Sequence, residues 1–446
     1  MASNHLFYKW GRGIDPALPR IERAEDEFLV TAEGDRLIDA AAGAAVVNLG
    51  HSPDGLDEVI TTQLDLVAYL SLSHFTTDAV EGLADRVAAR TPNGLDHVFP
   101  VTSGSEAVET AIKLARDFHR QQGNEAKSVV IGRERSYHGA TLGALAAGGH
   151  RARRAPYEPL LADWPSIGPA YPYRWSYSGT PQEQARAAAG ELEATIRETG
   201  PGRVAAFIAE PVGGASIPAT CPHPAYYHQI RRICDEYDVL FIADEVMTGF
   251  GRTGPLFAVD RFDVVPDILA IGKGLSGGYT PIGAAVVHRE IARSYRGDDA
   301  RFLHGHTFGG NPLSAAIANE VVDRYTPAVL ETGRQRGQRI ADGLESLADH
   351  PNVGELRHVG VMLGIELVRD RESKAPFDPD HQVANRLYEA LLDRGVYTYP
   401  GAGSVDGEAG DHLMLAPPLT VGEASADRIA EETVEAVRTV MDDPTG

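Results

Sequence analysis

Residues 239–244 read Val-Leu-Phe-Ile-Ala-Asp, an unbroken apolar run that ends at an acidic residue. A strand is apolar throughout when both faces of its sheet are covered, because successive side chains point to opposite faces. Strands are also predicted at 97–102, 128–131, 204–209 and 267–271, and helices at 105–121, 182–197, 224–237 and 313–325. This alternation predicts the α/β class, with a mainly parallel sheet wrapped by helices.

The two ends of the chain have a different pattern. We expect an N-terminal arm and part of a small domain at 1–75, a large domain at 76–325, and the rest of the small domain at 326–446. The first segment predicts a β-hairpin within 21–41, turning at Glu33-Gly34-Asp35, and a helix at 55–68. The last segment predicts helices at 328–347, at 380–393 and from Glu423, with strands at 359–367 and just before Pro417-Pro418.

The net charge of the 446-residue chain is −22, which argues against binding to nucleic acids or anionic membranes, because both need a basic surface. No apolar stretch reaches the roughly 18 residues of a membrane span, and residues 1–10 lack the pattern of a secretion signal. Two cysteines, Cys221 and Cys234, are too few for a disulfide framework or a metal set. We therefore expect a cytoplasmic protein without a metal site.

Lys273 follows the predicted strand at 267–271 and lies between Gly272 and Gly274, with no nearby acidic partner. An amine that loses water in such a place has a lowered pKa and becomes nucleophilic. A solvated loop lysine is the alternative, since lysines are almost never fully buried. The surrounding glycines also match the dinucleotide fingerprint G-x-G-x-x-G, but no helix can begin cleanly through the Gly-Gly-Tyr-Thr-Pro that follows.

Asp244 ends its apolar strand, and ligands of open α/β sheets bind beyond such strand ends. A carboxylate there could keep a pyridine nitrogen protonated, so that the ring acts as an electron sink. Metal binding and helix capping are alternatives for an aspartate in this position. No Asp or His cluster lies close by in the sequence to complete a metal site.

Ser103 and Glu106 form the S-x-x-E capping box that opens a predicted helix. A well-capped helix without a ligand is the simpler interpretation of this common motif. The free N–H groups at the helix start, with Gly104 and the Ser105 hydroxyl, could also hold a phosphate dianion.

Two further segments are ambiguous alone. Tyr137, in Ser136-Tyr137-His138-Gly139, could stack on a flat ring or could be an ordinary core tyrosine. Glu210 follows the predicted strand at 204–209, and a surface acid is the default interpretation.

Taken together, the segments resemble the class III aminotransferases, the ω-aminotransferase group of fold-type I enzymes that use pyridoxal 5′-phosphate (PLP). The resemblance covers nearly the whole chain, and the order and spacing of several motifs are far more specific than any one of them. The resemblance implies the fold of this family, which has a large domain with a mainly parallel sheet of the seven-stranded type, covered by helices. A small α+β domain is formed from both chain ends. The motifs are Asn48-Leu49-Gly50-His51, Ser103 to Glu106, Tyr137-His138-Gly139, Glu210-Pro211, Asp244 to Gly254, Ile271-Gly272-Lys273-Gly274, Thr307 to Pro312 and Ala416-Pro417-Pro418-Leu419.

The resemblance implies that Lys273 forms the Schiff base with PLP and then moves a proton between the substrate's α-carbon and C4′ of the cofactor. Asp244 would pair with the pyridinium nitrogen. Thr307 would reach the phosphate of the other subunit, which makes a homodimer the minimum active unit and leaves a tetramer open. The remaining cofactor-binding residues would be Ser103, Gly104 and Ser105 at the phosphate, Tyr137 and Val246 on the two ring faces, His138 beside the ring, and Glu210 in the polar network.

The chain departs from the family pattern in two places. Met247 replaces a glutamine that contacts the ring hydroxyl in many members, and residues 405–416 contain no arginine to bind the acceptor's carboxylate. Arg12, Arg20 and Arg174 are the replacement candidates. Tyr8, Trp10 and the loop between Trp164 and Trp175 are the candidate walls of the substrate pocket.

We therefore expect a PLP-dependent aminotransferase that moves an amino group from a primary amine or amino acid, including ω-amino compounds, to an α-keto acid such as pyruvate by a ping-pong mechanism. An aminomutase, racemase or decarboxylase could use the same residues. An NAD-dependent oxidoreductase lacks a credible fingerprint, and a non-enzymatic protein of this fold would have no need of Lys273.

Overall fold

The computed structural model describes residues 5, 7, 18–297 and 301–442. Its largest sheet has seven strands in the order β4-β10-β9-β8-β7-β5-β6. Only β10 runs antiparallel to its neighbours within this described sheet, so the sheet is mainly parallel, as predicted. The strands are β4 (Leu95–Val101), β5 (Val129–Arg133), β6 (Ser166–Ile167), β7 (Val204–Ala209), β8 (Leu240–Asp244), β9 (Ile268–Ile271) and β10 (Gly283–His288).

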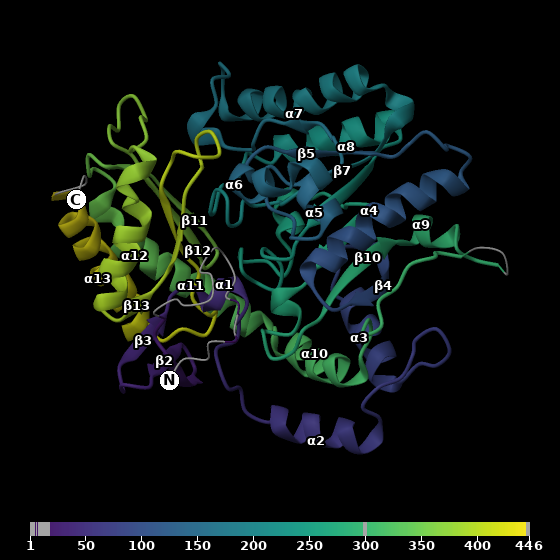
Figure 1. The fold of residues 1–446 in the computed structure, drawn as a ribbon, viewed down its shortest axis with the longest axis horizontal. Helices are drawn as coiled ribbons and strands as arrows, with labels where there is room; N and C mark the ends of the chain where they lie inside the picture. Colours follow the sequence, from purple (N-terminus) through teal and green to yellow (C-terminus); the bar gives the residue numbers. More distant parts are fainter. Residues whose placement is uncertain (1–4, 6, 8–17, 298–300, 443–446) are drawn as a thin grey trace.

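Helices cover both faces of this sheet, which is why the central strands β7, β8 and β9 are buried along their whole length and almost entirely apolar (Figure 1). In β8, Leu240 and Ile242 pack with α4 and α5 on one face, whereas Phe241 and Ala243 pack with helices of the other face. The helices are α3 (Asp78–Ala88), α4 (Gly104–Gln121), α5 (Leu142–Ala147), α7 (Pro181–Thr199), α8 (Ala225–Tyr237), α9 (Arg289–Arg293) and α10 (Pro312–Arg324).

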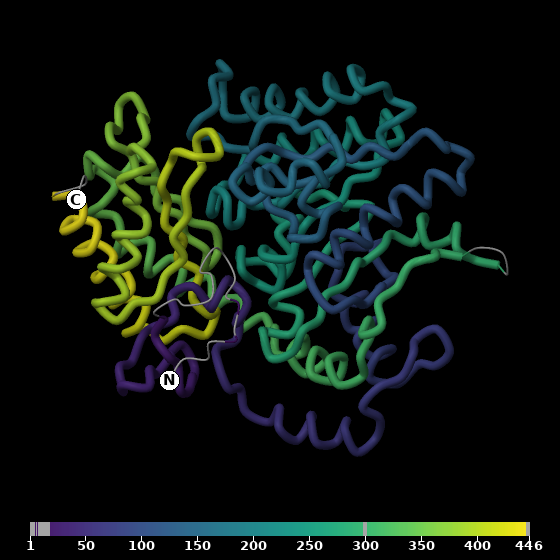
Figure 2. The backbone as a smooth tube through the Cα atoms, viewed as in Figure 1, coloured from purple at the N-terminus to yellow at the C-terminus, as the bar shows by residue number. Residues whose placement is uncertain are grey.

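The smaller part of the molecule is built from both ends of the chain, whose purple and yellow segments lie side by side (Figure 2). One small sheet joins β1 (Ile21–Glu25), β2 (Phe28–Thr31), β3 (Arg36–Asp39) and β13 (Val396–Tyr397), and β13 runs parallel to β3. The second is antiparallel, with β11 (Val353–Val359), β12 (Met362–Leu367), β15 (His412–Leu415) and β14 (Tyr399–Gly401). The helices are α11 (Pro327–Gly343), α12 (Val383–Asp393) and α13 (Glu423–Asp442), and the predicted fold class is confirmed.

Several predicted elements need correction. The predicted strands at 359–367 are one strand, β12, preceded by β11, which was missed because only part of it is buried. Strand β10 was also missed. The predicted hairpin turns at Gly34 between β2 and β3 as expected, with β1 added before it.

The segment that connects the two parts contains α1 (Ala42–Ala45) and α2 (Leu56–Leu66). Helix α2 lies against α10 (Figure 1). The domain boundaries at residues 75 and 325 stay predictions.

Arg252 ties the end of β8 to both parts of the chain. Its fully buried guanidinium donates from Nη1 to the carbonyl of Ala416, at 2.9 Å, and to that of Pro417, and from Nη2 to Asn48 Oδ1, at 2.5 Å. A buried charge is costly unless it is hydrogen-bonded, and here both terminal nitrogens of Arg252 have acceptors, whereas its Nε has none among the described residues. Arg252 therefore holds three distant segments at one edge of the sheet.

Among the described residues, no helix is long and apolar enough to cross a membrane. The cytoplasmic location stays a prediction.

Candidate active site

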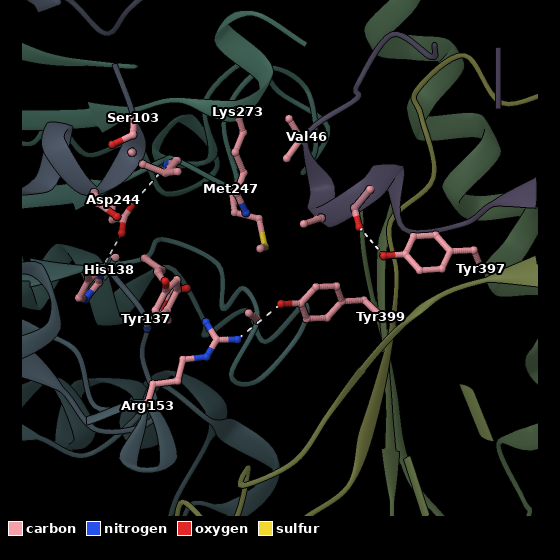
Figure 3. Close-up of a pocket in the computed structure, with 18 residues that line it drawn as sticks. Val46, Ser103, Tyr137, His138, Arg153, Asp244, Met247, Lys273, Tyr397 and Tyr399 are labelled. Carbon is pink, nitrogen blue, oxygen red and sulfur yellow. Dashed lines mark hydrogen bonds and ion pairs between the residues drawn. The ribbon is translucent and has the colours of Figure 1, made fainter. Parts of the chain in front are cut away.

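A cavity of about 620 Å³ lies where the large sheet faces the small part of the molecule. It is bounded by the residues that follow β7, β8 and β9, by the start of α4, and by residues of the N-terminal segment and of β13 and β14. Parallel strands bring their carboxyl ends to one edge of a sheet, and ligands bind there in open α/β folds. Figure 3 shows the side chains that face this cavity.

Lys273 points into the cavity from the end of β9 (Figure 3). Its backbone has a φ of 43°, in the left-handed region that costs a residue with a side chain some strain. Burial lowers the pKa of this amine to about 8, and the carboxylates of Asp244 and Glu210 oppose part of that shift. The expectation of no nearby acidic partner was therefore wrong in space, although burial remains the larger effect on the pKa.

Asp244 and His138 form a buried pair beneath the cavity. His138 Nδ1 lies 2.7 Å from Asp244 Oδ2, and the Val246 N–H donates to Asp244 Oδ1 at 3.0 Å. These contacts leave the carboxylate one well-defined orientation at the cavity wall. His138 Nε2 is buried and has no hydrogen-bond partner among the described residues.

Glu210 is a buried acid, 6% exposed, and not the surface acid of the default interpretation. Its carboxylate accepts from the Tyr137 N–H at 3.4 Å and from the Gly214 N–H at 3.2 Å. Burial raises the pKa of Glu210, while the nearby His138 ring lowers it in part. Glu210 thus connects the segment that carries Tyr137 to the end of β7.

Residues 103–105 form the start of α4 at the cavity. The Glu106 N–H donates to Ser103 Oγ at 3.2 Å, which confirms Ser103 as the helix cap. The other half of the predicted capping box was wrong, because the Glu106 carboxylate accepts from the N–H of Thr102, at 2.7 Å, and not from Ser103. Ser105 Oγ accepts from the Ala140 N–H at 3.0 Å, which joins α4 to the segment after Gly139.

The residues present fit PLP. The start of α4 supplies free N–H groups and the positive end of the helix dipole for a phosphate. A side chain at Gly104 would displace Val246, another cavity residue, because its Cβ would lie 2.5 Å from Val246 Cγ1. Asp244 provides an acceptor for a pyridinium N–H on the same wall, and Tyr137 and Val246 both line the cavity. No three His, Cys, Asp or Glu side chains gather as a metal site in the described part of the chain.

Several predicted residues lie elsewhere. Thr307 is exposed and does not line the cavity of its own chain. The loop between Trp164 and Trp175 does not line this cavity of its own chain: the Trp175 indole donates to the Pro169 carbonyl at 3.0 Å and lines a separate cavity, so its role as a substrate wall stays a prediction. Arg20 is exposed, Arg174 pairs with Glu366 at 3.1 Å, and neither lines this cavity of its own chain. Tyr8, Trp10 and Arg12 lie outside the described residues.

Other cavity residues were missed by the sequence analysis. Arg153 belongs to the short helix α6 (Arg151–Arg154), and Tyr397 and Tyr399 come from β13 and β14. Met247, at the position of the expected glutamine, also lines the cavity. The one signal for Arg153 was the basic run Arg151-Ala152-Arg153-Arg154, a short distance after Tyr137.

Comparison with known proteins gives one consistent family. The family model described as aminotransferase class-III matches residues 11–437. The chain is 34% identical to the putrescine–pyruvate aminotransferase of Pseudomonas aeruginosa over 92% of its length and 88% of that protein. It is 36% identical to the uncharacterized aminotransferase YodT of Bacillus subtilis, over 95% of the chain and 96% of that protein.

Solved structures give the same result. An (S)-enantioselective omega-transaminase from Thermomicrobium roseum superposes with a TM-score of 0.89 at 33% identity, over 95% of this chain and 93% of that one. The omega transaminase of Pseudomonas jessenii in complex with PMP superposes with a TM-score of 0.87 at 31% identity, over 96% and 94%.

The variant Gly104→Ala tests the phosphate cradle. The added methyl group would press on Val246, and overpacking of this kind costs about 1–3 kcal/mol, so we expect PLP affinity of the apoprotein to fall about tenfold or more. Equilibrium dialysis measures this affinity. The double variant Gly104→Ala/Val246→Ala removes the clashing atoms and should recover part of it.

Gly190→Ala is the matched control, because a Cβ at Gly190 meets nothing within 4 Å. Equal PLP affinities of the Gly104→Ala variant and this control would contradict the assignment of the cradle.

Proposed function

The chain belongs to the class-III aminotransferase family, and we propose that the cavity beyond β7, β8 and β9 is where this PLP-dependent transaminase works. One observation carries the proposal. Lys273 and Asp244, from the ends of the adjacent strands β9 and β8, line the same cavity as the start of α4. One cavity thus contains a nucleophilic amine, an acceptor for a ring nitrogen and a cradle for a phosphate.

Asp244 holds a proton on the cofactor's ring nitrogen. Bound PLP supplies an aldehyde carbon and an electron-withdrawing ring that stabilises negative charge at the substrate's α-carbon. The ring withdraws electrons best when its nitrogen is protonated, and a carboxylate accepting that N–H favours the proton there. His138, 2.7 Å from Asp244 Oδ2, positions the carboxylate for this contact.

Lys273 moves the proton. Its neutral amine can take the proton from the substrate's α-carbon and return it at C4′, which general acid–base catalysis requires of one group that faces both atoms. A pKa of about 8 suits this exchange, because both protonation states are then populated near neutral pH. Val246 and Tyr137 would pack on the two ring faces, and Glu210 would hold the Tyr137 segment in place.

Transamination is the reaction that agrees with the relatives, which are named aminotransferases, and we propose a primary amine as donor and a small α-keto acid as acceptor. The name of the putrescine–pyruvate relative supports such a pair for this chain. A racemase or decarboxylase of the same fold would not leave the cofactor in its amine form.

Replacing Lys273 tests the proposed base and nucleophile. With an amine donor alone, the wild-type holoenzyme should convert its cofactor to the pyridoxamine form, whereas Lys273→Ala should lose this conversion by at least about a hundredfold, the usual scale of a lost general base. Stopped-flow absorbance measures it. Lys113→Ala is the control, because that lysine lies outside the cavity and contacts His304.

The same amine should govern the pH dependence of cofactor capture. Because the pKa of Lys273 is lowered to about 8, its neutral fraction rises as pH rises through that value, so the rate at which the apoprotein takes up PLP covalently should rise there too. A rate that falls with pH between 7 and 9 would contradict the assignment.

We also propose a homodimer in which Thr307 reaches the partner's cofactor phosphate. The support is a pair of exposed aromatic side chains beside Thr307: Tyr69 and Phe308 are 45% and 61% exposed, and their ring centroids lie 5.9 Å apart. Large exposed apolar side chains that gather in one region mark interaction surfaces. The Tyr69 hydroxyl, which donates to the Thr307 carbonyl at 3.1 Å, orients the segment within this surface.

A mixed-subunit experiment tests the action of Thr307 across the interface. Thr307→Ala alone should weaken PLP binding, and Lys273→Ala alone should be inactive. Refolding the two variants together should create heterodimers with one site that has both native residues, so activity should return to about a quarter of the wild-type level when the subunits mix at random. If the mixture is no more active than the Thr307→Ala protein at the same dilution, Thr307 does not act in the partner's site.

A further inference from the structure

Arg153 brings a guanidinium to the cavity on the side opposite Lys273. Figure 3 shows its side chain rising from α6 toward the space into which the Lys273 amine points. The two cations are close enough for the charge of Arg153 to lower the pKa of Lys273. A substrate that reacts at Lys273 is therefore within the field of Arg153.

Aromatic residues hold this guanidinium at the cavity. Its central carbon lies 4.2 Å from the centroid of the Tyr137 ring, a distance typical of a cation–π contact. Its Nη2 lies 3.5 Å from the Tyr399 hydroxyl, which comes from β14 on the other side of the cavity. The adjacent Arg154 fixes α6 itself, because its Nη1 donates to the carbonyls of Ala146 and Gly148 at 2.7 and 2.6 Å.

The acidic groups of the cavity are engaged with other partners. Asp244 contacts His138 and the Val246 N–H, and Glu210 accepts from two backbone N–H groups. Asp244 and Glu210 line the same cavity as Lys273. Arg153 lines the same cavity, so an added carboxylate would meet a positive charge there.

We propose that Arg153, positioned by Tyr137 and Tyr399, binds the α-carboxylate of the keto-acid acceptor; this rests on the proposed transaminase function. The carboxylate of an α-keto acid is attached to the carbon that reacts, so its binding group must face the space that the Lys273 amine enters, as Arg153 does from the opposite side. A planar guanidinium is suited to bidentate contact with a carboxylate, and a half-buried site strengthens that contact. Residues 405–416 offer no arginine for this task, and Arg174 is paired with Glu366.

Arg153 would also allow the cavity to distinguish the amine donor from the keto-acid acceptor by charge. A primary amine without a carboxylate makes no use of Arg153, and its apolar part would lie against the aromatic and aliphatic walls. The keto acid would be recognised by charge. The same cavity can then accept the apolar part of an amine in one half-reaction and the carboxylate of a keto acid in the other.

The two half-reactions, followed separately by the absorbance of the cofactor, test this division. In Arg153→Met, we expect a rise in the pyruvate concentration that gives half the maximal rate of converting the pyridoxamine form back to the PLP form. The rise should be about tenfold or more, the effect of losing hydrogen bonds to a charged group. The limiting rate at saturating pyruvate should change less than that concentration. Arg153→Lys should lie between, because it keeps the charge and loses the planar fork.

Propanal serves as an acceptor without a carboxylate. The preference of the enzyme for pyruvate over propanal should fall about tenfold or more in Arg153→Met, because only pyruvate has the group that Arg153 binds. Arg151→Met is the matched control, since Arg151 belongs to the same helix, is exposed and does not line the cavity. It should keep the wild-type preference.

Calorimetric titration of pyruvate into the PLP-loaded enzyme, which has no amino group to transfer, gives a readout besides turnover. Binding should be detectable in the wild type and in Arg151→Met, and about tenfold weaker or lost in Arg153→Met. Unchanged pyruvate affinity in Arg153→Met would overturn the proposal, and so would equal losses with pyruvate and propanal. A wild-type enzyme that converts no amine donor would instead contradict the proposed function.

Discussion

The burial of one amine, that of Lys273, at the end of β9 is the physical constraint on which the cavity depends. Loss of water holds the pKa of this amine at about 8, and the carboxylates of Asp244 and Glu210 oppose only part of that shift. The chain also accepts a left-handed backbone at Lys273 to direct the side chain into the cavity. The remaining features of the site either surround this amine or fix groups relative to it.

The parallel sheet explains how residues far apart in sequence come together. Ala209 pairs with Ala243 and Asp244 pairs with Ala270, so the residues that follow β7, β8 and β9 lie along one edge. Arg252 then fastens that edge to Asn48 and to the carbonyls of Ala416 and Pro417. Cofactor residues thus come from the large sheet, whereas the opposite wall comes from segments near both chain ends.

Much of this arrangement could be predicted from the sequence, because it depends on local signals. The apolar run at 204–209 coincides with β7, and Lys273, Asp244 and the Ser103 cap follow strand ends or open a helix, as their motifs indicate. Arg153 and Tyr399 could not be assigned, since their meeting depends on how the small part packs on the sheet. The role of the loop between Trp164 and Trp175 could not be decided from its composition, because aromatic residues in a long loop can equally pack on the chain itself, as Trp175 does on Tyr226.

Borohydride reduction of the PLP-loaded protein, followed by peptide mass spectrometry, tests the central claim most directly. Reduction fixes the cofactor to the amine that holds it, and the chain offers five lysines to compare: Lys9, Lys113, Lys127, Lys273 and Lys374. The account predicts a single pyridoxyl adduct, on Lys273. An adduct on another lysine, or none at all, would contradict it.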